Sequence, residues 1–523
     1  MKNMKSFIHP FLFTIFPILF LFSHNVGGGI SISEIIIPSA VALGFAALLL
    51  LFLSLLLKDR DRVGIVGSII LILFFSYGHV FEIVRHWRIG SLDLDNHVYL
   101  MLVWCEMMVS GIYFFVKTPK GLENVTQFAN IVAATLVVMS LGNIGFYEFS
   151  TRDVQQSEVG RHEQVFDSVG LDARSDPPDI YYVILDGYAS SSTLEAIYGY
   201  DNHDFIKDLI ERGFFVASES RSNYPTTYHS LASSLNMDYV NHLADSVGVR
   251  SSDLQVLAQM IEDNWVVEFL KAQGYTFIHL SSGWGPTESN RHADLSSEDF
   301  NMQCGAWGGI WDEFVTLLIQ TTMLRPFSSY IIGGDARAKI LCAFSMLIEA
   351  RRIEGPKFVF AHILSPHPPF LFGRDGEPVP ETLLKLDGYV WEQKEAYVDQ
   401  LIFINKQVEV LVDDWLAKSK TPPVIILQAD HGSASSFGGT KSPEWEQPTQ
   451  EMLEERFHIF NAYYLPGNGD DLLYDSITPV NTFRLIFNVY FDTSYDLLED
   501  RSYHVTHNDP YVFTDVTQEV ALE

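Results

Sequence analysis

The sequence predicts an α/β protein in two parts, a five-helix transmembrane domain followed by a doubly wound, mostly parallel α/β sheet domain. The first observation is a series of long apolar segments that ends near residue 150 of 523. The second is an abrupt change, from residue 179 onward, to short apolar runs that alternate with helical patterns. The third is charge. Residues 1–150 hold nine Lys and Arg and nine Asp and Glu, so the net charge of −31 lies in residues 151–523.

The acidic charge and the cysteines exclude some classes of function. A nucleic-acid-binding protein needs a basic patch, and neither part of the sequence has one, so we expect no nucleic-acid partner. The three cysteines have no metal-binding spacing. Cys105 lies in an apolar run. We expect Cys304 and Cys342 to be two separate buried thiols, although they could pair in an oxidising compartment.

The first part contains the predicted membrane spans. A helix needs roughly 20 apolar residues to cross the hydrocarbon core. Five segments meet this requirement, at residues 7–24, 35–57, 63–84, 97–116 and 124–149. The first resembles a signal peptide because Lys2 and Lys5 precede it, but no small-residue cleavage site follows. We therefore expect a retained helix.

Positive charge in the connecting segments predicts the orientation, because cytoplasmic loops are enriched in Lys and Arg. Alternate segments carry seven cations: Lys2, Lys5, Lys58, Arg60, Arg62, Lys117 and Lys120. The opposite segments carry only Arg85 and Arg88. We therefore expect a multi-pass protein of the inner or plasma membrane with a cytoplasmic N-terminus. After five crossings the polar linker at residues 151–178 and the domain at residues 179–523 lie outside the cytoplasm.

The second part begins with a predicted buried strand at residues 179–187, a β-rich apolar run bounded by Pro and by Asp-Gly. Further strands are expected near residues 214–217, 275–280, 357–363, 423–428 and 457–464. Helices are expected near residues 192–199, 203–212, 261–273, 391–417 and 479–490. Such alternation predicts a sheet covered by helices on both faces. Ligands bind these sheets at the carboxyl ends of the strands, so residues there are the candidates for function.

Two strand ends carry acidic residues. The first strand ends in Asp186, and the strand at 423–428 is followed by Asp430, His431 and a glycine. Carboxylate oxygen and imidazole nitrogen are common ligands of Zn²⁺ and Mn²⁺, and glycine allows a tight turn around an ion. The alternative, equally weighted on these residues alone, is that Asp430 caps a turn and His431 lies at the surface.

A candidate nucleophile lies between these strands. Residues 222–236 predict a turn that leads into a helix, with Thr226 or Thr227 in its first turn. The positive end of a helix stabilises both an alkoxide and an incoming phosphate, and a metal bound to the same oxygen would lower its pKa further. The alternative is an ordinary threonine N-cap, which the local sequence alone favours.

Histidines provide further candidates. In the loop SPHPPF at residues 365–370, prolines hold His367 at the same edge of the sheet. This suits substrate binding, protonation of a leaving group or metal ligation. His362 is expected to be a strand-end residue bonded to backbone, with a second metal site as the alternative. We expect surface positions for the remaining candidates, His458, His504 and His507.

The order of these motifs resembles the alkaline phosphatase/sulfatase superfamily. The motifs are an apolar strand ending in Asp-Gly, a Thr-x-x-Ser helix start, the Ser-Pro-His-Pro-Pro-Phe loop and a strand ending in Asp-His-Gly. The resemblance covers about residues 179–490 and implies an alkaline phosphatase-like fold. The five-span anchor with an outer domain looks like the membrane-anchored lipoteichoic acid synthase and phosphoethanolamine transferase branch.

The resemblance implies a role for each candidate. Asp186, Asp430 and His431 would bind a divalent metal, Zn or Mn, with Thr227 as nucleophile and fourth ligand. Thr227 is preferred to Thr226 because a serine follows it three residues later, as in those transferases.

His367 would contact the substrate phosphate or the leaving group. Those transferases usually carry Glu where this chain has Asp186, and Asp is more typical of the two-metal phosphatase and phosphodiesterase branches. One metal site is expected, but the Asp leaves a second site open, with His362 and His367 as its nearest candidate ligands.

The function implied is metal-dependent phosphoryl-group transfer through a covalent phosphothreonine, which moves a phospholipid headgroup onto a cell-envelope glycan or lipid acceptor. One alternative is a membrane-anchored phosphodiesterase or phosphatase that uses water as acceptor on a phospholipid or another phosphodiester. The other is a non-catalytic sensor or scaffold on the same fold. The Cys/Ser-x-Pro-x-Arg signature of sulfatases is absent, so a sulfatase in the strict sense is not expected. The sequence predicts neither protein partners nor the oligomeric state.

Overall fold

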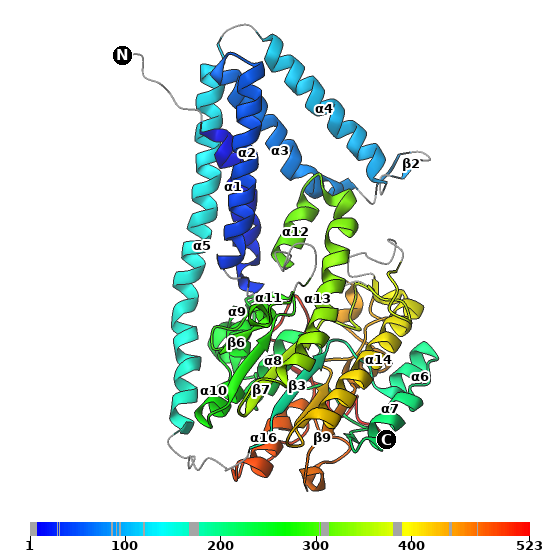
Figure 1. Ribbon diagram of the computed structural model, residues 1–523. Helices are drawn as coiled ribbons and strands as arrows, with labels where there is room; N and C mark the ends of the chain where they lie inside the picture. Colours follow the sequence, from blue (N-terminus) through cyan, green and yellow to red (C-terminus); the bar gives the residue numbers. More distant parts are fainter. Residues whose placement is uncertain are drawn as a thin grey trace. The chain divides into compact units, whose positions relative to one another are not determined.

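The computed structural model describes residues 8–28, 30, 32–84, 87–89, 92–93, 96–118, 121–166, 177–302, 304, 313–379, 390–438, 442–467 and 469–522. Lys2, Lys5, Arg85 and Lys120, which carry part of the predicted charge asymmetry, lie outside these residues. The chain forms two compact units. Unit 1 comprises Met1–Arg152 and Ile310–Ile332, and unit 2 comprises Asp153–Gly309 and Gly333–Glu523. Figure 1 shows their helices and strands coloured along the chain.

Five long helices form most of unit 1: α1 (His9–Asn25), α2 (Ile36–Leu56), α3 (Arg60–Val84), α4 (His97–Lys117) and α5 (Glu123–Phe166). Strands β1 (Arg88–Ile89) and β2 (Leu92–Asp93) form an antiparallel pair between α3 and α4. Among the described residues, four segments are long and apolar enough to cross a membrane, namely Ile32–Leu56, Arg60–Val84, His97–Lys117 and Glu123–Tyr147. Large apolar side chains on them are exposed, as expected of helices that face lipid. Examples are Leu48, Leu55, Leu102, Val109 and Phe128.

The predicted count of five spans is therefore corrected to four. The first predicted segment is a helix, α1, but it has only 17 residues. At 1.5 Å per residue it is about 26 Å long, less than the roughly 30 Å of a hydrocarbon core. Helix α5 differs in the other direction, because it continues to Phe166 through the first half of the predicted linker.

A distant part of the chain completes unit 1. Helix α12 (Glu313–Thr321), which the sequence analysis assigned to the second domain, lies in the second stretch of this unit. Phe314 and Leu318 are buried in one cluster with apolar residues of α1, α2 and α3. Beyond α12, Arg325 forms an ion pair with Glu82 of α3. The stretch Ile310–Ile332 is therefore held in unit 1 by apolar packing and by an ion pair.

Gly78 of α3 is expected to be essential for this packing. A Cβ at Gly78 would lie 2.7 Å from Thr321 Cα and would overlap the carbonyl oxygen of Gln320. Gly78→Leu should therefore lower the free energy of unfolding by about 1–3 kcal/mol through overpacking, measured by thermal denaturation in detergent. Gly44→Leu is the matched control, because no atom lies within 4 Å of a Cβ there. Equal stability of the two variants would contradict the α3–α12 contact.

A seven-stranded sheet forms the centre of unit 2, in the order β4-β9-β8-β3-β7-β5-β6. The strands are β3 (Ile180–Leu185), β4 (Phe215–Val216), β5 (Thr276–Leu280), β6 (Leu295–Ser296), β7 (Lys357–Ile363), β8 (Val424–Gln428) and β9 (Asn461–Tyr464). Strands β8, β3, β7, β5 and β6 are parallel, whereas β9 and β4 join one edge antiparallel. The predicted mostly parallel sheet is confirmed; the antiparallel pairing of β9 and β4 and the short edge strand β6 are additions.

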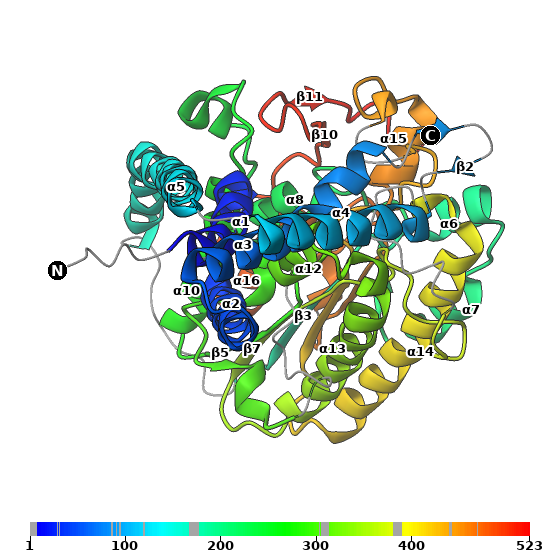
Figure 2. The ribbon, with the colours of Figure 1, turned by 90° about the horizontal axis from the view of Figure 1, so that it is seen from above.

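Helices cover both faces of this sheet. They are α6 (Ser191–Tyr198), α7 (His203–Glu211), α8 (Thr227–Asn236), α9 (Gln255–Glu262), α10 (Trp265–Ala272), α11 (Gly285–Glu288), α13 (Ser328–Ala350), α14 (Lys394–Lys418), α15 (Gln450–Phe457) and α16 (Pro479–Tyr490). Alternate residues of β3 enter different cores. Tyr181 and Val183 pack with α13 and α14, whereas Tyr182 and Ile184 pack with α8, α9, α10 and α16. Figure 2 shows α13 and α14 side by side.

Two local predictions are wrong. The expected helix at 261–273 is two helices, α9 and α10, because Asn264 adopts an extended backbone and caps α10 by accepting from the Val267 N–H at 2.9 Å. Cys304 and Cys342 form a disulfide, with their Cα atoms 5.6 Å apart. The two cysteines lie on either side of the stretch that belongs to unit 1. A short antiparallel pair, β10 (Tyr503–His504) and β11 (Thr514–Asp515), lies near the C-terminus.

Candidate metal centre

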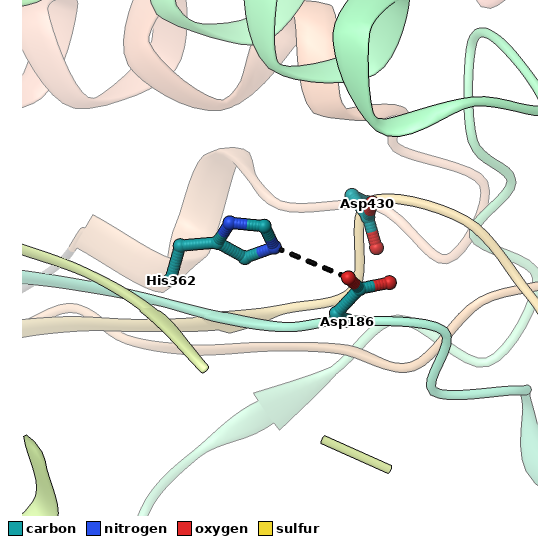
Figure 3. Close-up of side chains that lie close together, drawn as sticks. All are labelled: Asp186, His362 and Asp430. Carbon is teal, nitrogen blue, oxygen red and sulfur yellow. Dashed lines mark ion pairs between the residues drawn. The ribbon is translucent and has the colours of Figure 1, made fainter. Parts of the chain in front are cut away.

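Three neighbouring parallel strands bring the acidic residues together. Asp186 directly follows β3, and Asp430 lies two residues beyond the end of β8. His362 is the penultimate residue of β7, where it is paired in register with Ile184 of β3. Because parallel strands end at the same edge of a sheet, these side chains meet there. Figure 3 shows Asp186, His362 and Asp430 pointing toward one another.

The distances define one compact cluster. Each of Asp186, His362 and Asp430 offers a ligand atom that lies within 4.8 Å of the others. His362 Nε2 lies 3.4 Å from Asp186 Oδ2. His431 Nε2 lies 3.3 Å from Asp430 Oδ2 and 3.6 Å from Asp186 Oδ1. Two carboxylates and two imidazoles therefore face one small volume.

The candidate nucleophile reaches the same cluster. Thr227 is the first residue of α8, and its Oγ1 lies 3.2 Å from His431 Nε2. Thr226 occupies the N-cap position, and its hydroxyl instead forms a 2.7 Å hydrogen bond with His229 Nδ1. The structure thus brings together all four predicted ligands, Asp186, Thr227, Asp430 and His431, whereas the Thr226 hydroxyl is directed to His229.

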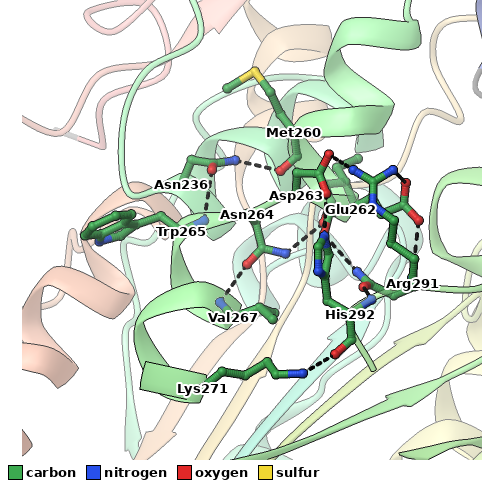
Figure 4. Close-up of polar contacts among 12 residues, drawn as sticks. Asn236, Met260, Glu262, Asp263, Asn264, Trp265, Val267, Lys271, Arg291 and His292 are labelled. Atoms are coloured by element: carbon green, nitrogen blue, oxygen red, sulfur yellow. Dashed lines mark hydrogen bonds and ion pairs between the residues drawn. The ribbon is translucent and has the colours of Figure 1, made fainter. Parts of the chain in front are cut away.

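The far end of α8 is fixed by a polar network. Asn236, its last residue, donates to the Met260 carbonyl oxygen at 2.8 Å and accepts from the Trp265 N–H at 3.1 Å. These bonds tie α8 to α9 and α10, and Asp263 at the turn between those helices pairs with Arg291 and His292 (Figure 4). A helix held at its end presents Thr227 in a fixed position.

The side chains fit a divalent cation. Within the described part of the chain, Asp186 Oδ1, His362 Nε2 and Asp430 Oδ2 are buried and have no hydrogen-bond partner. The remaining polar atoms of two of these residues are satisfied, because Asp430 Oδ1 accepts from the Gly187 N–H at 3.1 Å and His362 Nδ1 bonds Thr287 Oγ1 at 2.9 Å. Unsatisfied buried polar atoms are costly. Three such atoms that point into one small volume are what a metal site with oriented ligands requires.

His431 is in the neutral tautomer that can bind a metal through Nε2. Its Nδ1 lies 3.0 Å from the Gly432 carbonyl oxygen, which can only accept, so Nδ1 carries the hydrogen and Nε2 keeps its lone pair. Burial, and after it the positive charge of Arg456, holds the pKa of His431 well below its usual value. The imidazole is therefore available to a metal at neutral pH.

The two carboxyls have opposite pKa shifts. Burial, and after it the charge of Asp186, raises the pKa of Asp430 to about 7. Burial acts in the same direction on Asp186, but the neighbouring imidazoles of His367 and His362 outweigh it and bring its pKa below the usual range. In the absence of a cation, the pair therefore holds a proton on Asp430 up to near neutral pH.

Metal affinity is expected to rise with pH for this reason. A cation can bind Asp430 only after the proton leaves, so below pH 7 each unit of acidification should raise the apparent dissociation constant up to about tenfold. Above pH 7 the dependence on this group should disappear. Zinc titrations of metal-depleted protein at pH 6, 7 and 8 measure the effect. A dissociation constant that does not change between pH 6 and 7 would contradict the proton on Asp430.

A cavity of about 200 Å³ lies beside the cluster, and Thr227, His431 and His367 line it. His367 is held by its backbone N–H, which donates to the Asp186 carbonyl oxygen at 2.9 Å. Its Nδ1 donates to the Pro368 carbonyl oxygen at 2.5 Å. Sequence analysis missed several other lining residues, among them Tyr228, Trp284, Trp391, Trp445, Arg456 and Thr506.

The remaining histidines differ from expectation. His362 is not merely bonded to backbone, because its side chain is fully buried and faces Asp186. His458 and His504 are buried, and their Nε2 atoms bond the backbone carbonyls of Val520 and Trp445. Their expected surface positions are therefore wrong. His507 is exposed, as predicted, and also lines the cavity.

No known family model matches the sequence, and a search of curated proteins finds no match either. Solved structures do match. The periplasmic domain of EcEptC from Escherichia coli has a TM-score of 0.42 and 12% identity, over 66% of this chain and 94% of that one. The integral membrane lipooligosaccharide phosphoethanolamine transferase A (EptA) from Neisseria meningitidis has a TM-score of 0.36 and 10% identity, over 93% of this chain and 95% of that one.

A third match is an alkaline phosphatase superfamily protein from Vibrio parahaemolyticus, with a TM-score of 0.37 and 10% identity over 64% of this chain and 74% of that one. The structural neighbours are thus phosphoethanolamine transferases, sulfatases and alkaline phosphatase superfamily members, as the motif order predicted. Because identities and TM-scores are low, the function proposed below depends on the geometry of the site.

Proposed function

We propose that the chain is a metal-dependent phosphoryl-group transferase that acts through a covalent phosphothreonine at Thr227. Its substrate would be a phospholipid, and a cell-envelope glycan or lipid would accept the headgroup. The observation that carries the proposal is the meeting of the Thr227 hydroxyl with two buried carboxylates and His431 at the end of a helix and beside a cavity. This arrangement provides a nucleophile, a site for a cation and room for a phosphoryl group.

Each residue has a defined role in the proposal. Asp186, Thr227, Asp430 and His431 would hold the cation, and His362 is a further candidate ligand. Zn²⁺ suits this set of carboxylate and imidazole donors, and Mn²⁺ is the alternative. When bound, the cation would lower the pKa of the Thr227 hydroxyl and offset negative charge on the phosphoryl oxygens.

The reaction would be a double displacement. In the first step the bond from Thr227 Oγ1 to phosphorus forms, the bond from phosphorus to the lipid oxygen breaks, and the hydroxyl proton passes to solvent. His367 donates a proton to the departing oxygen, so the lipid leaves as an alcohol. In the second step the acceptor hydroxyl gives its proton to His367 and attacks the same phosphorus. The bond to Oγ1 breaks, and Thr227 regains a proton from solvent.

Features outside the site support a location of unit 2 on the extracytoplasmic side of a membrane. The chain has four candidate spans among its described residues, so unit 2 is covalently attached to a membrane-embedded unit. Disulfides such as Cys304–Cys342 persist in oxidising compartments. We therefore propose that unit 2 lies outside the cytoplasm of an inner or plasma membrane, where phospholipid is the abundant phosphodiester.

Product analysis tests the proposal against its rivals. Zinc-loaded, full-length protein is incubated with phospholipids labelled in the headgroup phosphate, in the presence of lipid and glycan acceptors. We expect an unlabelled diacylglycerol, label on an acceptor, and label on the peptide that contains Thr227 after acid quenching. Label released only as a water-soluble headgroup phosphate would identify a hydrolase. Protein that takes up no zinc under loading conditions and shows no turnover would favour a scaffold.

A further inference from the structure

Arg456 is a buried arginine that joins the two loops of the site. It lies near the end of α15 and is 5% exposed. Its Nε donates to the Pro225 carbonyl oxygen at 2.7 Å, two residues before Thr227. Its Nη1 donates to the Gly432 carbonyl oxygen at 2.8 Å, next to His431. One guanidinium therefore connects the loop of the nucleophile with the loop of the metal ligands.

These bonds leave part of the guanidinium available. An arginine has five N–H donors, and in the described structure Nη2 has no hydrogen bond or ion pair. Arg456 lines the same cavity as Thr227 and His431. Its guanidinium carbon lies 5.3 Å from the ring centre of Trp445, so an aromatic ring also packs against the group. A guanidinium group with available N–H donors thus borders the cavity.

Arg456 brings a positive charge to the wall of the cavity. Burial lowers the pKa of Arg456 only to about 10, so it keeps its charge. Arg456 is also without a direct carboxylate partner in the described structure. A buried charge of this kind needs an anion or strong acceptors.

We infer that Arg456 is a substrate-binding residue, whose Nη2 donates to a non-bridging oxygen of the phosphoryl group that Thr227 attacks. Guanidinium donors match phosphate oxygens in both geometry and charge. The inference rests on the proposed function and adds to it the residue that binds the phosphoryl group. Because Arg456 also holds the loops of Thr227 and His431, it places the substrate phosphorus relative to both.

The test compares two arginines with similar hydrogen bonds to backbone carbonyls. Arg484 also donates to two backbone carbonyls, from Nε to Met237 and from Nη1 to Asp496, each at 2.7 Å, but it does not line the cavity. Zinc-loaded, full-length protein in detergent is titrated with inorganic phosphate in a calorimeter, and its zinc content is measured. Arg456→Ala should weaken phosphate binding about 10–100-fold at unchanged zinc content. Arg484→Ala should change it by less than about twofold.

The outcomes separate the inference from the proposed function. Wild-type affinity for phosphate in folded, zinc-loaded Arg456→Ala would overturn the inference and leave the phosphoryl-transfer proposal intact. A zinc-loaded wild type that binds no phosphate would instead refute the proposed function, and the inference with it. If Arg456→Ala does not fold, the wild-type structure with zinc and phosphate decides. We expect Nη2 about 2.8 Å from a phosphate oxygen, and a phosphate that does not touch Arg456 would overturn the inference.

Discussion

Replacement of Thr227 by Ala is expected to lower phospholipid turnover by at least about 10³-fold, because the hydroxyl that would form the covalent intermediate is lost. Stability should change little, since Thr227 is the first residue of α8 and alanine is favourable in helices. Zinc content should fall only partly, because two carboxylates and His431 remain. Steady-state turnover, thermal unfolding and zinc analysis of the same preparation measure these three effects.

Thr226→Ala is the matched control for this substitution. The Thr226 hydroxyl bonds His229 rather than the metal cluster, so turnover should stay within about tenfold of the wild type. Thr227→Ser keeps a hydroxyl and should retain more activity than Thr227→Ala. The nucleophile assignment fails if Thr227→Ala turns over at the wild-type rate, and it moves to the neighbouring residue if only Thr226→Ala is inactive.

The meeting of Asp186 with Asp430 was predictable because strand ends are easy to recognise in a sequence. The run from Ile180 to Leu185 is uniformly apolar and stops at Asp186, and the run from Val424 stops shortly before Asp430. Parallel strands place such ends at one edge of the sheet even when about 245 residues separate them. The periodicity thus predicted which residues share an edge. It could not predict that His362 faces Asp186, because a buried strand has apolar neighbours on both faces.

Features that depend on tertiary contacts were not predictable. Helix α12 has the amphipathic composition of many helices, so Phe314 and Leu318 gave no sign that they belong to unit 1. Cys304 and Cys342 are 38 residues apart in the chain, and that separation contains no information on the distance between them in space. Arg456 belongs to no motif. The one available signal was an arginine directly before the apolar segment that enters β9, which many surface helices also have.

Asp430→Asn is expected to abolish zinc binding and turnover while it stabilises the metal-free protein. The amide is a poor metal ligand but can still accept from the Gly187 N–H, so the loop should keep its conformation. In the wild type, burial and Asp186 raise the pKa of Asp430 from 3.8 to about 7. A carboxyl whose pKa is raised in the folded state disfavours folding once it is ionised. At pH 8 the substitution should therefore raise the free energy of unfolding of metal-free protein by about 1–3 kcal/mol.

The size of this effect should depend on pH, and its sign on the partner of the buried acid. At pH 5, metal-free Asp430 keeps its proton in the folded protein but loses it on unfolding, so the gain in stability should be smaller than at pH 8, and it should vanish only below the unfolded pKa of 3.8. Asp179→Asn is the control, because Asp179 Oδ2 lies 2.6 Å from Nζ of the buried Lys357. That variant should lose about 3 kcal/mol, since it leaves an unpaired buried charge. Urea unfolding after chelation, at pH 8 and pH 5, measures both variants. A loss of stability in Asp430→Asn at pH 8 would show that the two carboxyls do not repel each other, and the case for a cation between them would lose its physical basis.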